Sequence, residues 1–326
     1  MPRVPYTKPA LLYVDQLQQL KNRGLIVAND AKALHLLENI SYYRLSGYWY
    51  PMLALPKENH LFKPNSTFEN AFRLYCFDRL FRQLILSELE KIEVAIRAKM
   101  IYLLSHSYGP FWFQNPAHFT SSYKHQIALN KLTTETSRSD EVFIKSFKLK
   151  YSDPLPPSWM ILEISSFGLL SNMYSNLRPG RTKRSVANYF GLDDSTFTSW
   201  IHSFSYIRNI CAHHARMWNR TFSITPQMPN LPIRPFIINQ YLPNPIAGGS
   251  PILNNKSSYF LCSMIIYFLN TINPKHRFIE KLENLFRQFP MVDRSAMGFP
   301  SNWKAEALWQ VRNESIWKKM QKYFCK

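Results

Sequence analysis

Residues 193–214 read Asp-Asp-Ser-Thr-Phe-Thr-Ser-Trp-Ile-His-Ser-Phe-Ser-Tyr-Ile-Arg-Asn-Ile-Cys-Ala-His-His. Apolar side chains recur every three or four positions, which is the spacing of one face of a helix. They are Phe197, Trp200, Ile201, Phe204, Ile207 and Cys211. Asp193 and Asp194 suit the N-terminal end, because carboxylates accept unpaired backbone N–H groups and meet the positive end of the helix dipole. The stretch therefore predicts a long helix with one buried face.

Three side chains near the end of this helix suggest chemistry. Arg208 falls four residues after Phe204, on or beside the apolar stripe, while Asn209 and His213 are four apart and share a face. Arginine and histidine without carboxylates suit RNA cleavage, because RNA carries its own nucleophile, the 2′-hydroxyl. The histidine can take or give the proton and the arginine can stabilise the phosphate, with the asparagine as orienter. The predicted catalytic residues are thus Arg208, Asn209 and His213, with His214 as a second candidate.

A simpler interpretation of the same residues stays open. Arginine and histidine near a helix C-terminus also cap carbonyl groups and interact favourably with the dipole. His214 is accordingly either a second acid or base or a cap. Arg216 either reaches the same phosphate as Arg208 or pins the helix to its partner, and Arg220 follows one turn later. Of the nine histidines, only His213 has an arginine five residues before it.

The charge of the chain points to a polyanion as partner. Its 326 residues carry 40 Lys and Arg against 21 Asp and Glu, for a formal net charge of +19. Nucleic acid is the first candidate, although a basic surface without a specific partner is the alternative. We therefore expect RNA contacts from Arg216 and Arg220 and from two further basic segments.

The first basic segment, residues 178–184, is the densest and surrounds a Pro-Gly turn. It is either a loop that grips phosphates or a solvated turn, and its basic residues are Arg178, Arg181, Lys183 and Arg184. The second is Arg44, within the aromatic stretch of residues 41–51. Aromatic residues around an arginine can stack on RNA bases, or they can form a corner of the core.

The composition predicts a mainly α protein with at most a small β hairpin. Apolar residues make up 46% of the chain, which is typical of a folded protein, and only 9 residues are glycine. We expect an N-terminal arm of helices and an aromatic motif (residues 1–65), a helical core (66–220), and a C-terminal part with an extended segment and helices (221–326). The hairpin would lie between residue 221 and residue 251.

Several segments outside the candidate helix carry specific expectations. A long helix or helix pair should begin near residue 66 and reach about residue 104, with Asp78/Arg82 and Glu93/Arg97 as solvated ion pairs. Residues 120–140 are polar and predict a loop. An apolar helix over residues 158–176 should pack against the Arg208 helix, and residues 309–324 predict a basic amphipathic helix.

The sequence offers little for a metal, a cofactor or a membrane. The four cysteines are scattered, which indicates free thiols in a reducing cytoplasm. Histidines lack Cys or carboxylate partners at zinc-ligand spacing, and no glycine-rich nucleotide-binding loop occurs. We therefore expect no metal, no cofactor, no signal peptide, no membrane span and a cytoplasmic location.

Several motifs resemble a known family. The pattern Arg-Asn-x3-His at residues 208–213 is similar to the signature of HEPN ribonucleases, and the longer string through Arg220 resembles the Abi-like (AbiD/AbiF) abortive-infection family. Further similarity lies in residues 41–51, in Leu-Tyr-x-Phe-Asp-Arg at 74–79, in Glu-x-Ala-Ile-Arg at 93–97, and around Met297-Gly-Phe-Pro.

The resemblance implies a HEPN-like helical bundle as the core and a bacterial role in phage defence or in a toxin–antitoxin system. It also implies a metal-independent endoribonuclease that leaves 2′,3′-cyclic phosphates. Because such enzymes combine two Arg-x4-His motifs, it implies a homodimer in which Arg208 and His213 of both chains meet. Relatives among RNA-guided effectors suggest a structured noncoding RNA as a partner. A non-catalytic protein that binds a small structured RNA is the alternative.

Overall fold

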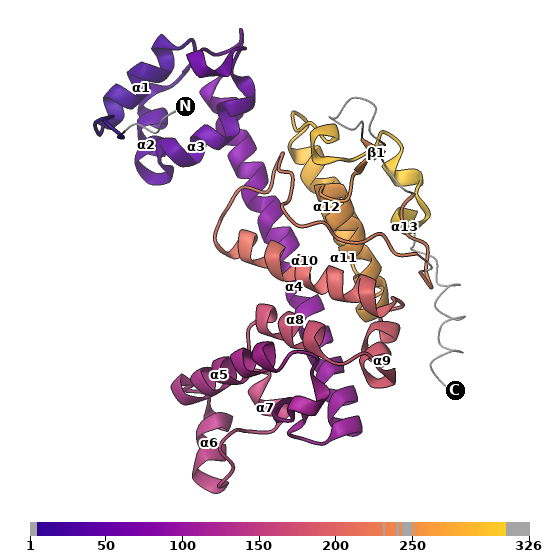
Figure 1. Ribbon diagram of the computed structural model, residues 1–326. Helices are drawn as coiled ribbons and strands as arrows, with labels where there is room; N and C mark the ends of the chain where they lie inside the picture. Colours follow the sequence, from indigo (N-terminus) through magenta and orange to yellow (C-terminus); the bar gives the residue numbers. More distant parts are fainter. Residues whose placement is uncertain (1–4, 231, 239–240, 243–249, 251, 311–326) are drawn as a thin grey trace. The chain divides into compact units, whose positions relative to one another are not determined.

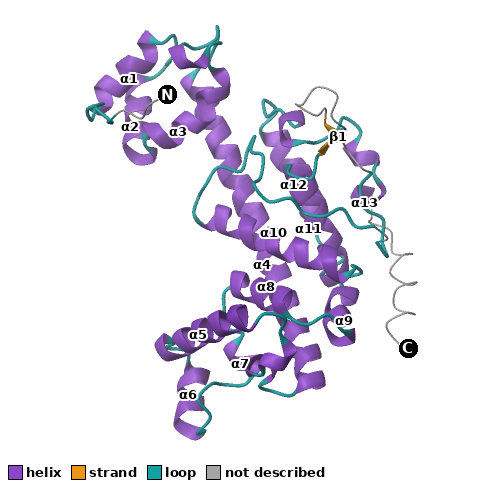
Figure 2. Ribbon diagram, viewed as in Figure 1, coloured by secondary structure: helices purple, strands orange, loops and turns teal. Residues whose placement is uncertain are grey.

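The computed structural model describes residues 5–230, 232–238, 241–242, 250 and 252–310. Helices dominate these residues, as Figure 2 shows, and the predicted mainly α fold is confirmed. The strands are β1 (Tyr241–Leu242) and β2 (Ile252–Leu253), which pair antiparallel with Tyr241 opposite Leu253. The small hairpin that the sequence predicts is therefore present, but its second strand lies just after residue 251, the expected limit.

The chain divides into two compact units, and each is described by itself. Of the described residues, those within 5–81 and 284–292 belong to the first, and those within 82–283 and 293–310 belong to the second. Two of the three boundaries fall inside helices, α4 (Phe68–Tyr108) and α12 (Phe278–Gln288), and the third follows Val292. The three-part division expected from the sequence stays a prediction.

The first unit is built on three short helices and the start of α4. These are α1 (Tyr13–Asn22), α2 (Asp30–Ile40) and α3 (Tyr42–Trp49). The Asn29 side chain caps α2 by accepting the Lys32 N–H at 2.9 Å. Tyr48 is buried and donates to the Asp78 carboxylate at 2.6 Å. Leu45, Tyr48 and Trp49 of the aromatic stretch thus form a corner of this unit's core, whereas Tyr43 and Tyr50 are exposed.

The second unit holds the remaining helices. They are α5 (Ser122–Arg138), α6 (Val142–Lys150), α7 (Ser158–Ile161), α8 (Phe167–Asn176), α9 (Arg181–Tyr189), α10 (Asp194–Ala212), α11 (Ser258–Ile272) and α13 (Ala307–Gln310). Short 3-10 turns lie in this unit at Trp112–Gln114, Pro116–His118, Ser295–Met297 and Trp303–Ala305, and in the first unit at Tyr50–Met52 and Lys57–Asn59. Most of the basic helix predicted over residues 309–324 lies outside the described residues.

Helix α10 lies at the centre of the second unit. It packs against α8 and α9, so the predicted pairing of the Arg208 helix with the 158–176 segment is confirmed (Figure 1). Phe268 of α11 is buried against three aromatic side chains of α10, with ring centroids 5.1 to 6.1 Å apart. The aromatic residues of α10 and α11 therefore fix the helix that carries the candidate site.

Two predictions about local structure are wrong. Residues 120–140 form α5 rather than a loop, because His125, Ala128, Leu132 and Thr136 make a buried helical stripe that includes polar residues. The segment of residues 158–176 is two helices rather than one. The Ser166 side chain accepts the Leu169 N–H at 3.3 Å and caps the start of α8. Serine side chains compete in this way with the backbone hydrogen bonds of a continuous helix.

The helices of the described residues differ from membrane spans. None of them combines the length and apolar character needed to cross a bilayer. The most apolar, α11, has 15 residues, and its described side chains from Ser258 to Asn270 are buried within the second unit. Its apolarity is thus accounted for by core packing.

Candidate functional site

Helix α10 forms as its sequence predicts. Asp193 caps its N-terminus, where one carboxylate oxygen accepts the Thr196 N–H at 2.9 Å and the other accepts the Thr196 hydroxyl at 2.6 Å. Such a cap stabilises a helix by about 1 kcal/mol. All six apolar positions of the predicted stripe are buried. The opposite face is left to the polar side chains, including His202 and Asn209, which are exposed.

The helix ends at the candidate histidines. His213 is the C-cap residue with φ −85°, and its N–H donates to the Asn209 carbonyl at 2.9 Å. His214 has a left-handed backbone with φ +57°. Its N–H bonds to the Cys211 carbonyl at 3.1 Å, and the Ala215 N–H bonds to Ile210 at 3.0 Å. This pair of bonds is a Schellman motif, in which the left-handed position is usually glycine.

Both imidazoles are thereby presented at the end of the helix. His213 and His214 are exposed, so either can meet a ligand from solvent. A left-handed residue with a Cβ is strained by about 1–2 kcal/mol, and such strain is found often at functional sites. Main-chain hydrogen bonds around His214 cap the C-terminal end of α10. The sequence alone does not show whether the backbone or the His214 side chain makes this cap.

Replacing His214 with glycine is expected to stabilise the protein by about 0.5–1 kcal/mol, because relief of the left-handed strain exceeds the added chain entropy of glycine. Thermal unfolding followed by circular dichroism measures the effect. The control is His213→Gly, whose φ of −85° offers no strain to relieve and which should lose stability. A lower melting temperature for His214→Gly would show that imidazole contacts outweigh the strain.

Arg208 stands at the edge of the buried stripe, as predicted. Its side chain is 41% exposed, and its Nη1 lies 3.4 Å from the Asn209 side-chain oxygen. Its Nε lies 3.9 Å from the Glu93 carboxylate on α4. The structure thus brings Arg208 and Asn209 together on the last turns of α10 and adds an acidic neighbour.

Glu93 is a residue of the site that the sequence does not reveal. The predicted ion pair of Glu93 and Arg97 forms at 2.8 Å, but the expectation that it is solvated is wrong, because the two side chains are only 13% and 11% exposed. Asp78 and Arg82, expected to be solvated as well, are also buried. Burial raises the pKa of Glu93, an effect opposed by the charges of Arg97 and Arg208. Only the packing of α4 beside α10 places Glu93 next to the motif, and no local pattern encodes it.

Arg216 and Arg220 follow the site in the chain. The Arg220 guanidinium donates to the Arg216 carbonyl at 3.2 Å. Tyr206 of α10 forms a 2.5 Å hydrogen bond with Ser223. Burial acts to raise the pKa of Tyr206, but the Ser223 hydrogen bond and the Arg220 charge outweigh it and lower the pKa. These contacts tie the segment after α10 back to the helix that bears the motif.

The basic segment of residues 178–184 separates into two classes. Arg178, Arg181 and Arg184 are exposed at the start of α9 and remain candidates for phosphate contacts. The prediction that Lys183 contacts phosphate is wrong, because this residue is 7% exposed and its ammonium lies 3.3 Å from Asp194. It joins α9 to the start of α10 instead of facing solvent. Arg44, in the first unit, is exposed on α3.

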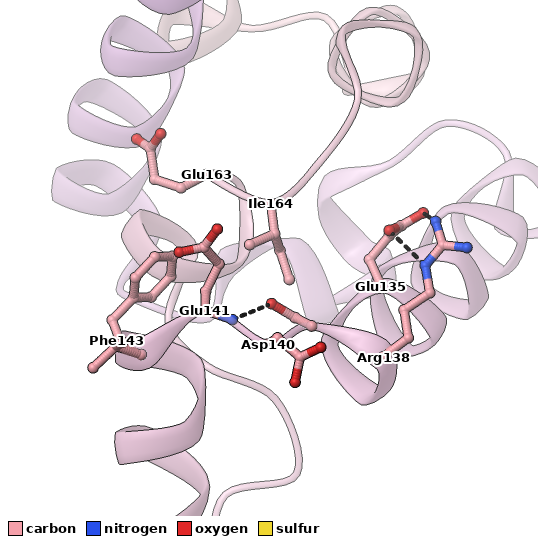
Figure 3. A pocket seen from close by; sticks show the side chains of 9 residues that line it. Glu135, Arg138, Asp140, Glu141, Phe143, Glu163 and Ile164 are labelled. Atoms are coloured by element: carbon pink, nitrogen blue, oxygen red, sulfur yellow. Dashed lines mark hydrogen bonds and ion pairs between the residues drawn. The ribbon is translucent and has the colours of Figure 1, made fainter.

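An open pocket of about 750 Å³ lies elsewhere in the second unit, between the end of α5, the start of α6 and Glu163 (Figure 3). Four carboxylates line it, and its one arginine is bonded to one of them, with Arg138 Nη2 2.5 Å from Glu135. Negative walls repel phosphate groups. The pocket is therefore a poor candidate for the RNA backbone.

Metal-ligating side chains and thiols are scattered over the described residues. Among them, no group of three or more His, Cys, Asp or Glu could hold a metal ion. Cys76, Cys211 and Cys262, the described cysteines, form no disulfide, and burial raises the pKa of Cys262. The described cysteines agree with the free thiols that the sequence predicts.

Comparison with known proteins gives one match. Residues 35–219 match the sequence profile of a family described as "Abi-like protein", which is more than half of the 326 residues. The matched range covers the helices from α3 through α10 and ends one residue before Arg220. No curated protein and no solved structure matches the chain.

Proposed function

This chain belongs to the Abi-like protein family, and from that premise we propose that it is a metal-independent endoribonuclease acting as an abortive-infection effector in bacterial phage defence. The observation that carries the proposal is the end of α10. There a half-exposed Arg208 and an exposed His213 stand within two turns, on a helix anchored in the core. Exposure lets an RNA strand reach both groups, and anchoring fixes their positions.

The proposed reaction needs one base, one acid and one cation. A neutral His213 removes the proton of a 2′-hydroxyl, whose oxygen attacks the adjacent phosphorus. The bond from phosphorus to the 5′-oxygen breaks, and a protonated histidine gives that oxygen its proton. Arg208 stabilises the extra negative charge of the transition state with charge-assisted hydrogen bonds. The products are a 2′,3′-cyclic phosphate and a 5′-hydroxyl.

The second histidine of this scheme has two sources. His214 of the same chain is adjacent and exposed. A homodimer would supply His213 from a second chain, which is the arrangement we propose because two Arg208/His213 pairs then share one site. Asn209, bonded to Arg208, orients the guanidinium. The exposed guanidiniums of Arg178, Arg181 and Arg184, with Arg216 and Arg220, would add sequence-independent phosphate contacts.

The experiment that tests the reaction class compares wild type with the double variant Arg208→Ala/His213→Ala on total RNA in EDTA. Mapping the new ends should show cyclic phosphates with wild type and none with the variant. An RNA with a single 2′-deoxy substitution at a mapped cut should resist cleavage there. Cleavage of the deoxy position, or equal cleavage by the double variant, would contradict the mechanism.

A second candidate function is binding of a small structured RNA without turnover. The net charge of +19 and the exposed arginines at the start of α9 support it, and they support the ribonuclease equally. Such an RNA could also restrain the ribonuclease, because an active effector would harm its own cell. Extraction of RNA from wild type and from the Arg208→Ala/His213→Ala variant decides whether the RNA is only bound or restrains a ribonuclease. A discrete RNA that stays intact, with no cleavage after it is stripped, indicates a binding protein, whereas cleavage that begins after stripping indicates a restraint.

A further inference from the structure

Glu93 lies between two arginines in the second unit. One carboxylate oxygen accepts from Arg97 Nη2 at 2.8 Å, and the other lies 3.9 Å from Arg208 Nε. The Glu93 side chain is 13% exposed, whereas that of Arg208 is 41% exposed. The carboxylate is therefore a fixed, nearly buried anion at the inner edge of the candidate site.

Arg97 explains why Glu93 holds a fixed position. Its Nη2 also donates to the Ser165 carbonyl at 3.0 Å, and its Nη1 lies 3.5 Å from Glu163. Its side chain is 11% exposed. Arg97 thus joins α4 to the segment between α7 and α8, and it holds the first Glu93 oxygen while the second faces Arg208. Ionised side chains that are buried persist when they are paired in this way.

We propose that Glu93 is a positioning residue that orients the Arg208 guanidinium for the RNA phosphate. This inference rests on the ribonuclease function proposed above. Arg208 has a long, flexible side chain, and binding a phosphate in the transition state requires one orientation of its planar group. Glu93 attracts the Nε edge and Asn209 contacts Nη1, so two edges of the guanidinium are constrained while the side chain stays accessible.

The sign of the charge makes the role testable. A carboxylate next to a phosphate site repels RNA, so Glu93 cannot serve to increase affinity. If it orients Arg208, its removal should slow the chemical step while RNA binding stays the same or becomes tighter. A loss of folding would instead lower the melting temperature and the active fraction together. These patterns differ in kcat, in the dissociation constant and in thermal unfolding.

The experiment uses the full chain with Glu93→Gln and the matched control Glu90→Gln. Glu90 lies one turn earlier on α4 and is exposed, and its charge acts on Glu93, so the control makes the same charge change nearby without removing the carboxylate that faces Arg208. The probe is an RNA oligonucleotide spanning a mapped cleavage site. For Glu93→Gln we expect kcat to fall about 10- to 100-fold, because small misplacement of a catalytic group has effects of this order. The dissociation constant should be unchanged or lower, and Glu90→Gln should match wild type in kcat.

A second variant and a mutant cycle complete the test. Glu93→Asp keeps the charge but withdraws it from Arg208, and it replaces the glutamine variant if that one fails to fold. In an Arg208→Lys background, Glu93→Gln should slow cleavage less than it does in wild type, because residues that act through each other are not additive. Wild-type kcat in both Glu93 variants, faster cleavage, or full additivity overturns the positioning role. Normal cleavage by Arg208→Ala overturns the ribonuclease proposal instead, and with it this inference.

Discussion

Cleavage of RNA by a His213→Ala variant is expected to be about 10²- to 10⁴-fold slower than by wild type, the range that removal of a general acid or base produces. His213 is exposed at the C-cap of α10, and its position is fixed by a main-chain bond to Asn209 at 2.9 Å. Alanine keeps that bond, so the helix end should be preserved. The measurement is single-turnover cleavage of an RNA oligonucleotide with protein in excess.

The matched control is His202→Ala. His202 is exposed on the same helix, three turns before His213, and lacks an arginine five residues earlier. Its removal should leave the cleavage rate within about twofold of wild type, since it belongs to no proposed step. RNA affinity of both variants should stay near that of wild type, because binding depends mainly on the arginines. Equal rates for His213→Ala and wild type would remove His213 from the mechanism.

Local patterns predict the framework of this site well. The apolar spacing of residues 197–211 and the capping role of Asp193 need only neighbours along the chain, and the structure has both. At these positions an interaction between neighbours along the chain determines the local structure, so the prediction from the sequence and the structure agree. The end of α4 is predicted near residue 104 and lies at Tyr108, before Gly109 with its φ of +87°.

Other features depend on contacts between distant residues. Glu93 and Lys183 look like surface charges in the sequence. In the structure each is nearly buried and lies near an opposite charge on another helix, Arg208 for Glu93 and Asp194 for Lys183. The stripe of α5 contains His125 and Thr136, whose burial depends on the neighbouring helices. His125 meets the Phe113 carbonyl at 2.8 Å, so a polar side chain occupies a core position. Hydrophobic periodicity cannot identify such positions.

Substituting Phe268 by alanine is expected to lower the free energy of unfolding by about 3–5 kcal/mol, as for other large-to-small changes in aromatic cores. Phe268 is 0% exposed. Its ring centroid lies 4.8 Å from that of Phe190, 6.0 Å from Phe197 and 5.1 Å from Phe204. The substitution removes the side chain on which α10 and the end of α9 converge, and leaves a cavity between rigid neighbours. Urea unfolding followed by circular dichroism measures the loss.

The control for this effect is Tyr123→Ala on α5, which removes an aromatic ring that is 75% exposed. Its stability should stay within about 0.5 kcal/mol of wild type, as is usual for surface substitutions. Because Phe268 contacts α10 directly, Phe268→Ala should also loosen the helix end that carries Arg208 and His213. Hydrogen exchange of the α10 amides should then be faster in Phe268→Ala than in Tyr123→Ala. Equal exchange in the two variants would mean that α8 and α9 alone hold α10 in place.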